Sequence, residues 1–158
     1  MTEFKLLGSL LILAAGGGAA FLSARTERRQ LTVLDGWIDL IALVRARIDC
    51  YLTPLDEIFS ALDPDLVRRC GGTLPCRSCA ALLRSASPEL SSEGRRLIGA
   101  FVTGIGDGYR EEQVRACDYY LDALRELRKK TAAELPARIR VRVALCLTAA
   151  LGAAILLW

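Results

Sequence analysis

Two long apolar runs, one at each end of the chain, constrain this sequence more than any other feature. Residues 6–24 contain no charged side chain and only two polar ones, Ser9 and Ser23. A helix of that length is about 28 Å long, close to the roughly 30 Å thickness of the hydrocarbon core of a bilayer. Residues 141–158 form a second run, which is interrupted only by Arg142. The pattern predicts a transmembrane helix at each end.

Each run has a second interpretation. The alternative for the first run is a cleaved signal peptide that ends near Ala24. Against it, the run is longer than a typical signal-peptide core, and Arg25 and Arg28 follow at once, where positive charge resists export. The alternative for the last run is a buried helix of a soluble domain. Against this, the segment from Leu145 onward is apolar all round rather than along one stripe.

The chain therefore divides into an N-terminal transmembrane helix (residues 1–24), a helical domain (25–142) and a C-terminal transmembrane helix (143–158). Basic residues border the middle segment on both sides: Arg25, Arg28, Arg29, Lys129, Lys130, Arg138, Arg140 and Arg142. The positive-inside rule then places the middle segment in the cytoplasm and both termini outside. We expect a protein of the cell membrane with two spans, in contact with membrane lipid.

The middle segment has the periodicity of helices and no convincing strand. We expect two long helices, the first continuous with the first span and the second ending before Pro136. Shorter helices lie between them, at about 54–62, 64–69, 75–85 and 91–102, and glycines make a loop at 104–108. Thr53, Asp63 and Ser91 or Ser92 are the expected helix caps. The fold class is all-α: a small helical bundle of two long helices plus short capping helices, flanked by the two spans.

The two long helices each carry an apolar stripe. The stripes consist of Leu31, Ile38 and Ile41 on the first helix and Val114, Leu121 and Leu124 on the second. We expect the stripes to bury each other. Trp37, Leu40 and Val44 widen the first stripe beyond what one small bundle requires. That surplus favours a second interpretation, in which this face docks a partner.

Small residues at four-residue spacing mark a packing face on each terminal run. They are Gly16 and Ala20 in the first run, and Ala149 and Ala153 in the second. Small side chains let two helices approach closely, so we expect the terminal helices to pack together through these positions.

The sequence offers little that could catalyse a reaction. It contains no histidine, which removes the Ser-His-Asp and Cys-His arrangements and every histidine metal site. It has no glycine-rich phosphate-binding motif, and its net charge of +3 is too small and too interleaved with acids to favour nucleic acid. We expect no enzyme, no catalytic residue, no cofactor, no bound metal, no small-molecule substrate and no nucleic acid.

The sharpest local pattern is Cys76-x-x-Cys79 with Cys70 six residues earlier. A structural zinc site needs four ligands, and here the fourth would be Cys50 or Cys117 from another helix. A redox motif would need a βαβ context, which is missing. Ordinary thiols are the favoured interpretation; a metal site and a redox pair remain alternatives. These two alternatives define rival functions. One is a membrane-anchored thiol or metal-responsive sensor that uses Cys70, Cys76 and Cys79, and the other is a membrane redox enzyme.

An acidic line runs along the second long helix at Asp118, Asp122 and Glu126, which are four residues apart. The basic residues three or four positions from its members are Arg115, Arg125 and Lys130. We expect these neighbours on the same helix to neutralise the line, which then forms a solvated face. A docking face for a basic partner is the alternative.

The ordered set of short motifs resembles the stage III sporulation protein AB family. The motifs are Arg29-Gln30-Leu31-x-x-Leu34, Thr53-Pro54-Leu55-x-x-Ile58, Gly106 followed by Gln113 on a helix with Tyr120 and Leu124, and the small-residue stretch 151–154 before the last apolar residues. This resemblance implies a structural scaffold subunit of the complex that links mother cell and forespore in endospore formation. The family is similar to the inner-membrane platform protein of type II secretion. The implied partners are other subunits of the stage III sporulation complex and, as a candidate, an assembly ATPase. The implied location of the domain is the mother-cell side of the outer forespore membrane.

Overall fold

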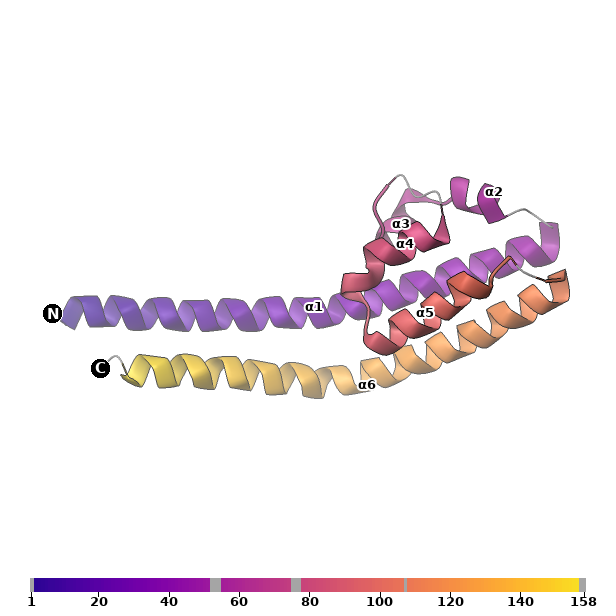
Figure 1. Ribbon diagram of the computed structural model, residues 1–158. Helices are drawn as coiled ribbons and strands as arrows, with labels where there is room; N and C mark the ends of the chain where they lie inside the picture. Colours follow the sequence, from indigo (N-terminus) through magenta and orange to yellow (C-terminus); the bar gives the residue numbers. More distant parts are fainter. Residues whose placement is uncertain (1, 52–54, 75–77, 107, 157–158) are drawn as a thin grey trace. The chain divides into compact units, whose positions relative to one another are not determined.

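The structure of the protein, a computed structural model, describes residues 2–51, 55–74, 78–106 and 108–156 (Figure 1). Side chains are described for these residues except 2–13, 51, 56, 154 and 156.

Two long helices dominate the fold: α1 (Thr2–Tyr51) and α6 (Arg110–Leu156). The short elements between them are α2 (Leu55–Ser60), α3 (Pro64–Arg69), α4 (Cys79–Ala86), the 3-10 turn η1 (Ser87–Glu89) and α5 (Ser92–Gly104) (Figure 1). All regular structure in the described ranges is helical, which confirms the all-α prediction. The continuity of the first long helix with the N-terminal apolar run is confirmed as well.

The chain divides into two compact units. Unit 1 comprises residues 1–28 and 132–158, and unit 2 comprises residues 29–131. Each long helix contributes to both units.

Helix α6 continues through Pro136, so the expected end before this proline is wrong. Proline lacks the N–H that would bond the carbonyl one turn earlier, which usually ends or kinks a helix. Here side-chain contacts connect the neighbouring turns. Arg138 forms an ion pair with Glu134 at 2.5 Å, and the Arg140 Nε donates to the Pro136 carbonyl oxygen at 3.2 Å.

The predicted membrane spans are not found in the described part of the chain. Among the helices in that part, none is both long enough and apolar enough to cross a membrane. The side chains of residues 6–13, in the first apolar run, lie outside the described residues, as do those of residues 154 and 156–158 in the second.

The core of unit 2 forms around helix α1. The α1 side chains that are almost completely buried are Val33, Leu34, Trp37, Leu40, Ile41, Val44 and Ile48. Side chains from every other α-helix join them in one apolar cluster, including Val67, Leu82, Phe101 and Leu124. The short helices also pack on α1. The buried apolar surface of α1 is therefore wider than the single stripe that α6 alone could cover. Trp37, Leu40 and Val44 are each 0% exposed, so their interpretation as a partner-docking face is wrong.

The C-terminal end of helix α3 lies directly against α1. A Cβ atom added to Gly36 would lie 2.6 Å from the backbone carbon of Arg69, closer than side-chain atoms approach backbone. Next to it, the Trp37 Nε1 donates to the carbonyl oxygen of Cys70 at 3.1 Å. Arg69 also forms an ion pair with Asp39 at 2.5 Å. Gly36, which interrupts the good helix formers in the sequence, is therefore the place where α3 contacts the backbone of α1.

Local side-chain hydrogen bonds define the starts of the short helices. Asp63 caps α3 by accepting from the Asp65 N–H, and Ser91 caps α5 by accepting from the Gly94 N–H, as expected. Helix α4 starts at Cys79, later than predicted, because the Ser78 side chain caps it by accepting from the Ala81 N–H. Residues 75–77, the start of that predicted helix, lie outside the described residues, as does the expected cap Thr53.

In unit 1, helices α1 and α6 approach closely at small residues. A Cβ atom on Gly16 would lie 2.7 Å from the Cβ atom of Ala150, and Ala20 and Ala150 are buried. The packing role of Gly16 and Ala20 is confirmed, whereas Ala149 and Ala153 are exposed. The difference is one of helix phase, since the sequence spacing identifies a small-residue face but not which of two neighbouring faces meets the partner helix.

Candidate functional site

The most distinctive polar feature of unit 2 is a set of arginine–aspartate pairs between α1 and α6, which we call the interhelical ladder. Its members are Asp35, Arg45 and Asp49 on α1, and Arg128, Asp118 and Arg110 on α6. The two helices run antiparallel, and the pairs follow one another along them. A slip of one helix along the other would break all the pairs together, so the ladder specifies the register.

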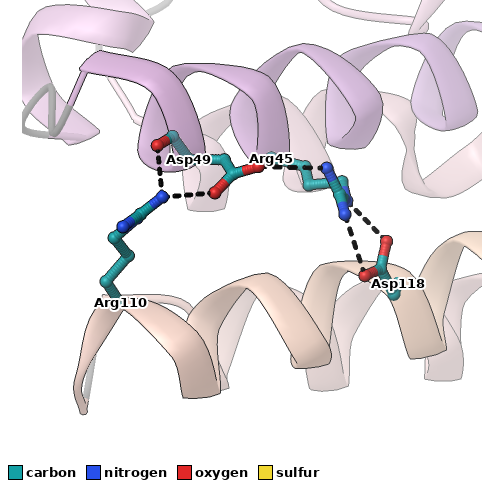
Figure 2. Close-up of polar contacts among 4 residues, drawn as sticks. All are labelled: Arg45, Asp49, Arg110 and Asp118. Carbon is teal, nitrogen blue, oxygen red and sulfur yellow. Dashed lines mark hydrogen bonds and ion pairs between the residues drawn. The ribbon is translucent and has the colours of Figure 1, made fainter.

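The central pair has bidentate geometry (Figure 2). The Arg45 Nε donates to one Asp118 carboxylate oxygen at 2.5 Å, and an Arg45 terminal nitrogen donates to the other at 3.2 Å. Two parallel N–H···O bonds of this kind fix the orientation of the guanidinium plane in addition to the attraction between the charges. Asp49 lies one turn further along α1, 3.6 Å from Arg45.

Arg110, at the start of α6, contacts Asp49 at two points (Figure 2). Its terminal nitrogen donates to the Asp49 carboxylate at 2.6 Å and to the Asp49 carbonyl oxygen at 2.7 Å. Asp49 lies in the last turn of α1, where backbone carbonyls have no intrahelical donor. The contact therefore satisfies a helix end and joins it to the next long helix.

Hydrogen bonding shifts the titration of the ladder. The hydrogen bond from Arg45 holds the pKa of the Asp118 carboxyl below its usual range, and the same bond raises the pKa of Arg45. The hydrogen bond to Asp35 likewise raises the pKa of Arg128. All these side chains are substantially exposed, so water screens the attraction between the charges. The pairs therefore contribute more to the relative orientation of α1 and α6 in unit 2 than to the stability of the fold.

The acidic line of the sequence is divided by the fold. Asp118 pairs mainly with Arg45 on the other long helix. The prediction that basic residues on α6 itself neutralise Asp118 is therefore wrong for its main contact. Asp122 does pair with Arg125 on its own helix, at 3.5 Å, as expected. Arg115 lies 3.8 Å from Glu111 instead of joining the line. The line is therefore not one continuous acidic surface.

The cysteines of the C-x-x-C segment lie only partly within the described residues. Cys70 and Cys79 are buried, whereas Cys76 falls in the segment 75–77, outside the description. Of the expected fourth ligands, Cys50 is exposed and Cys117 is buried. Within the described ranges, no group of three or more His, Cys, Asp or Glu side chains is placed to hold a metal ion.

Cys117 has the environment of a core thiol. Burial, and to a smaller extent the neighbouring Asp118, raise its pKa to about 11. The thiol therefore stays protonated at neutral pH, and the protonated form is a poor nucleophile and a poor metal ligand.

The ladder was not predicted, although the sequence carries a signal for it. Arg45 stands where the 3–4 apolar spacing of its helix calls for an apolar residue. A charge within a core-facing stripe calls for an opposite charge on the facing helix, and Asp118 lies in the middle of the second stripe. Asp35, Asp49, Arg110 and Arg128 lie beside the stripes and carry no such signal.

The surface of α6 in unit 2 presents one large aromatic side chain that is held in place. Tyr119 is 66% exposed, and its ring meets the edge of the Tyr120 ring with centroids 5.2 Å apart. Tyr120 in turn contacts the buried ring of Phe101. A tyrosine oriented in this way, with charged neighbours, is typical of the anchors found in protein interfaces.

Residues 5–73 match the family model described as Stage III sporulation protein AB (spore_III_AB). Two of the resembling motifs, at residues 29–34 and 53–58, lie inside the matched region, and the others lie beyond it. No curated protein and no solved structure was found to match the chain.

Proposed function

We propose that this chain is a non-catalytic scaffold subunit of the trans-envelope complex between mother cell and forespore in endospore formation. Through residues 5–73 it belongs to the Stage III sporulation protein AB family. The family match is the observation that carries the proposal. The use of polar side chains in unit 2 supports it. The charged residues between the long helices pair with each other and fix the register of the two helices.

The terminal helices are the proposed membrane anchors. Residues 6–24 carry no charge, and the described side chains of unit 1 expose apolar groups on both helices. These exposed side chains are Phe21, Leu22, Val141, Leu145, Leu147, Leu151 and Ile155. Lipid would cover them at less cost than water. With basic residues at the inner ends of both runs, the helical domain would face the mother-cell cytoplasm at the outer forespore membrane.

Other subunits of the complex are the proposed partners, with an assembly ATPase as a candidate. Tyr119 is the surface residue best suited to test this. We would place a photo-crosslinking amino acid at Tyr119 in sporulating cells, with the same group at Arg95, an exposed position on α5, as the matched control. We expect position 119 to trap another sporulation protein, identified by mass spectrometry.

Loss of the gene provides the functional test. Cells without it should form far fewer heat-resistant spores, and a gene copy encoding the intact chain should restore them. Normal spore counts in the deletion strain would contradict the proposed role. Crosslinks only to proteins with no part in sporulation would contradict the proposed partners.

Metal analysis separates the scaffold from the rival thiol or metal sensor. The full chain, purified under reducing conditions, should contain much less than one zinc ion per molecule. Stoichiometric zinc that is lost in a Cys79→Ser variant would favour the sensor.

A further inference from the structure

A hollow of about 350 Å³ lies on the unit 1 part of helix α1, where the apolar run gives way to basic residues. Phe21, Ala24, Arg25 and Arg28 line it. Two of these side chains are apolar and two carry guanidinium groups. The lining therefore combines an apolar portion with groups that bind anions.

The arginines of unit 1 differ in how they are neutralised. Arg142 pairs with the buried Glu27 at 2.9 Å, and Arg138 pairs with Glu134. Arg25 has no ion pair or hydrogen bond with any residue that the structure describes. Arg28 does interact within the chain, so Arg25 supplies the main unmatched charge of the hollow.

The apolar side of the hollow continues into exposed apolar surface. Phe21 is 69% exposed and Leu22 is 61% exposed, on the side of Arg25 that leads into the uncharged run. An anion that bound here would have its charge beside Arg25 and any apolar portion beside Phe21. A phospholipid has this arrangement, with a phosphate next to acyl chains.

We propose that this hollow binds the headgroup of an anionic phospholipid, with Arg25 and Arg28 contacting the phosphate and Phe21 contacting the acyl chains. The site rests on the proposed membrane anchoring and adds a headgroup preference to it. Guanidinium groups bind phosphate oxygens through paired, charge-assisted hydrogen bonds. Each basic residue close to an anionic membrane surface strengthens binding by several fold, so two should give a preference of roughly 10- to 30-fold.

The test uses the full chain in neutral detergent. Native mass spectrometry would compare the binding of phosphatidylglycerol and phosphatidylcholine that have the same acyl chains. The test variant is Arg25→Gln with Arg28→Gln. The matched control is Arg95→Gln with Arg96→Gln, which removes the same charge from two exposed arginines of α5. A further arm adds inorganic phosphate as a competitor.

The expected result is a preference for phosphatidylglycerol of roughly 10-fold or more, which falls to within about twofold in the test variant and persists in the control. An unchanged preference in the test variant would overturn the site. Displacement of phosphatidylglycerol by an equal concentration of inorganic phosphate would assign the hollow to a soluble anion and overturn the lipid.

Vesicle flotation keeps this inference separate from the membrane anchoring. If the chain floats with pure phosphatidylcholine vesicles but shows no headgroup preference, the anchoring stands and the headgroup site fails. If it floats with neither neutral nor anionic vesicles, both fail.

Discussion

Trp37 on helix α1 donates its indole N–H to the carbonyl oxygen of Cys70, the residue that follows the last turn of α3, and both residues are fully buried. This hydrogen bond joins two segments that are 33 residues apart. It satisfies a carbonyl at a helix C-terminus that has been removed from water. The large ring fills the core while its polar atom anchors the next helix, so one residue couples packing to the position of α3.

Replacing Trp37 by Phe should therefore cost more than the lost ring volume. The Cys70 carbonyl would lose its donor in a dry site, which costs about 1–3 kcal/mol of unfolding free energy. Urea denaturation followed by circular dichroism measures the change. Tyr109→Phe, at an exposed position, is the control and should leave the midpoint unmoved. Equal midpoints for the two variants would show that the hydrogen bond contributes nothing.

Gly36 and Gly99 allow a matched comparison of the same substitution in two helices. In Gly36→Ala the new methyl group would meet the backbone of Arg69, so we expect a loss of about 1–3 kcal/mol. In Gly99→Ala the nearest atom would be a Leu83 methyl at 3.9 Å, an ordinary contact. Alanine favours helix over glycine, so Gly99→Ala should gain up to about 1 kcal/mol. Denaturation midpoints that shift in the same direction would contradict the close contact of α3 with α1.

The Arg45–Asp118 pair should make stability depend on acid pH. The pKa of Asp118 is lower in the folded protein than in the unfolded chain. Its contribution is therefore complete above the unfolded pKa and disappears as the pH falls through the folded pKa. The denaturation midpoint of the native chain should exceed that of Asp118→Asn at neutral pH, and the difference should close as the pH falls through the folded pKa of Asp118. A difference that does not vary with pH would assign the effect to something other than this carboxylate.

Cys117 and Cys50 should differ sharply in reactivity. Cys117 is buried with a pKa of about 11, whereas Cys50 is exposed. Alkylation by iodoacetamide at about pH 8 should modify Cys50 in the folded chain and Cys117 only after unfolding. Peptide mapping by mass spectrometry identifies the modified residues. Fast modification of Cys117 in the folded chain would contradict its placement in the core.

Close packing in unit 1 should depend on Gly16 and not on its neighbour. Gly16→Leu would drive a side chain into Ala150 and should lower the melting temperature of the full chain in detergent. Gly17→Leu is the control, since nothing lies within 4 Å of the added Cβ atom. If both variants melt alike, the two helices do not meet at Gly16.

Local features of the sequence were enough to predict most elements. The helical periodicity, the Asp63 and Ser91 caps and the loop glycines Gly106 and Gly108 act through bonds and conformations within a few residues of each other. Each can therefore be recognised without knowing the fold. The same is true of the motifs within residues 5–73 that indicated the family. Gly104, expected in the same loop as Gly106 and Gly108, is instead the last residue of α5.

The tertiary structure alone decided what each helix face meets. From the sequence, Trp37 was surplus apolar surface and Asp118 was part of an acidic line, yet the first is buried beside Cys70 and the second pairs with Arg45. The sequence also marked Pro136 as a boundary that α6 passes through. Burial and pairing depend on residues that are tens of positions away along the chain, and only packing brings them within the few ångströms over which they act.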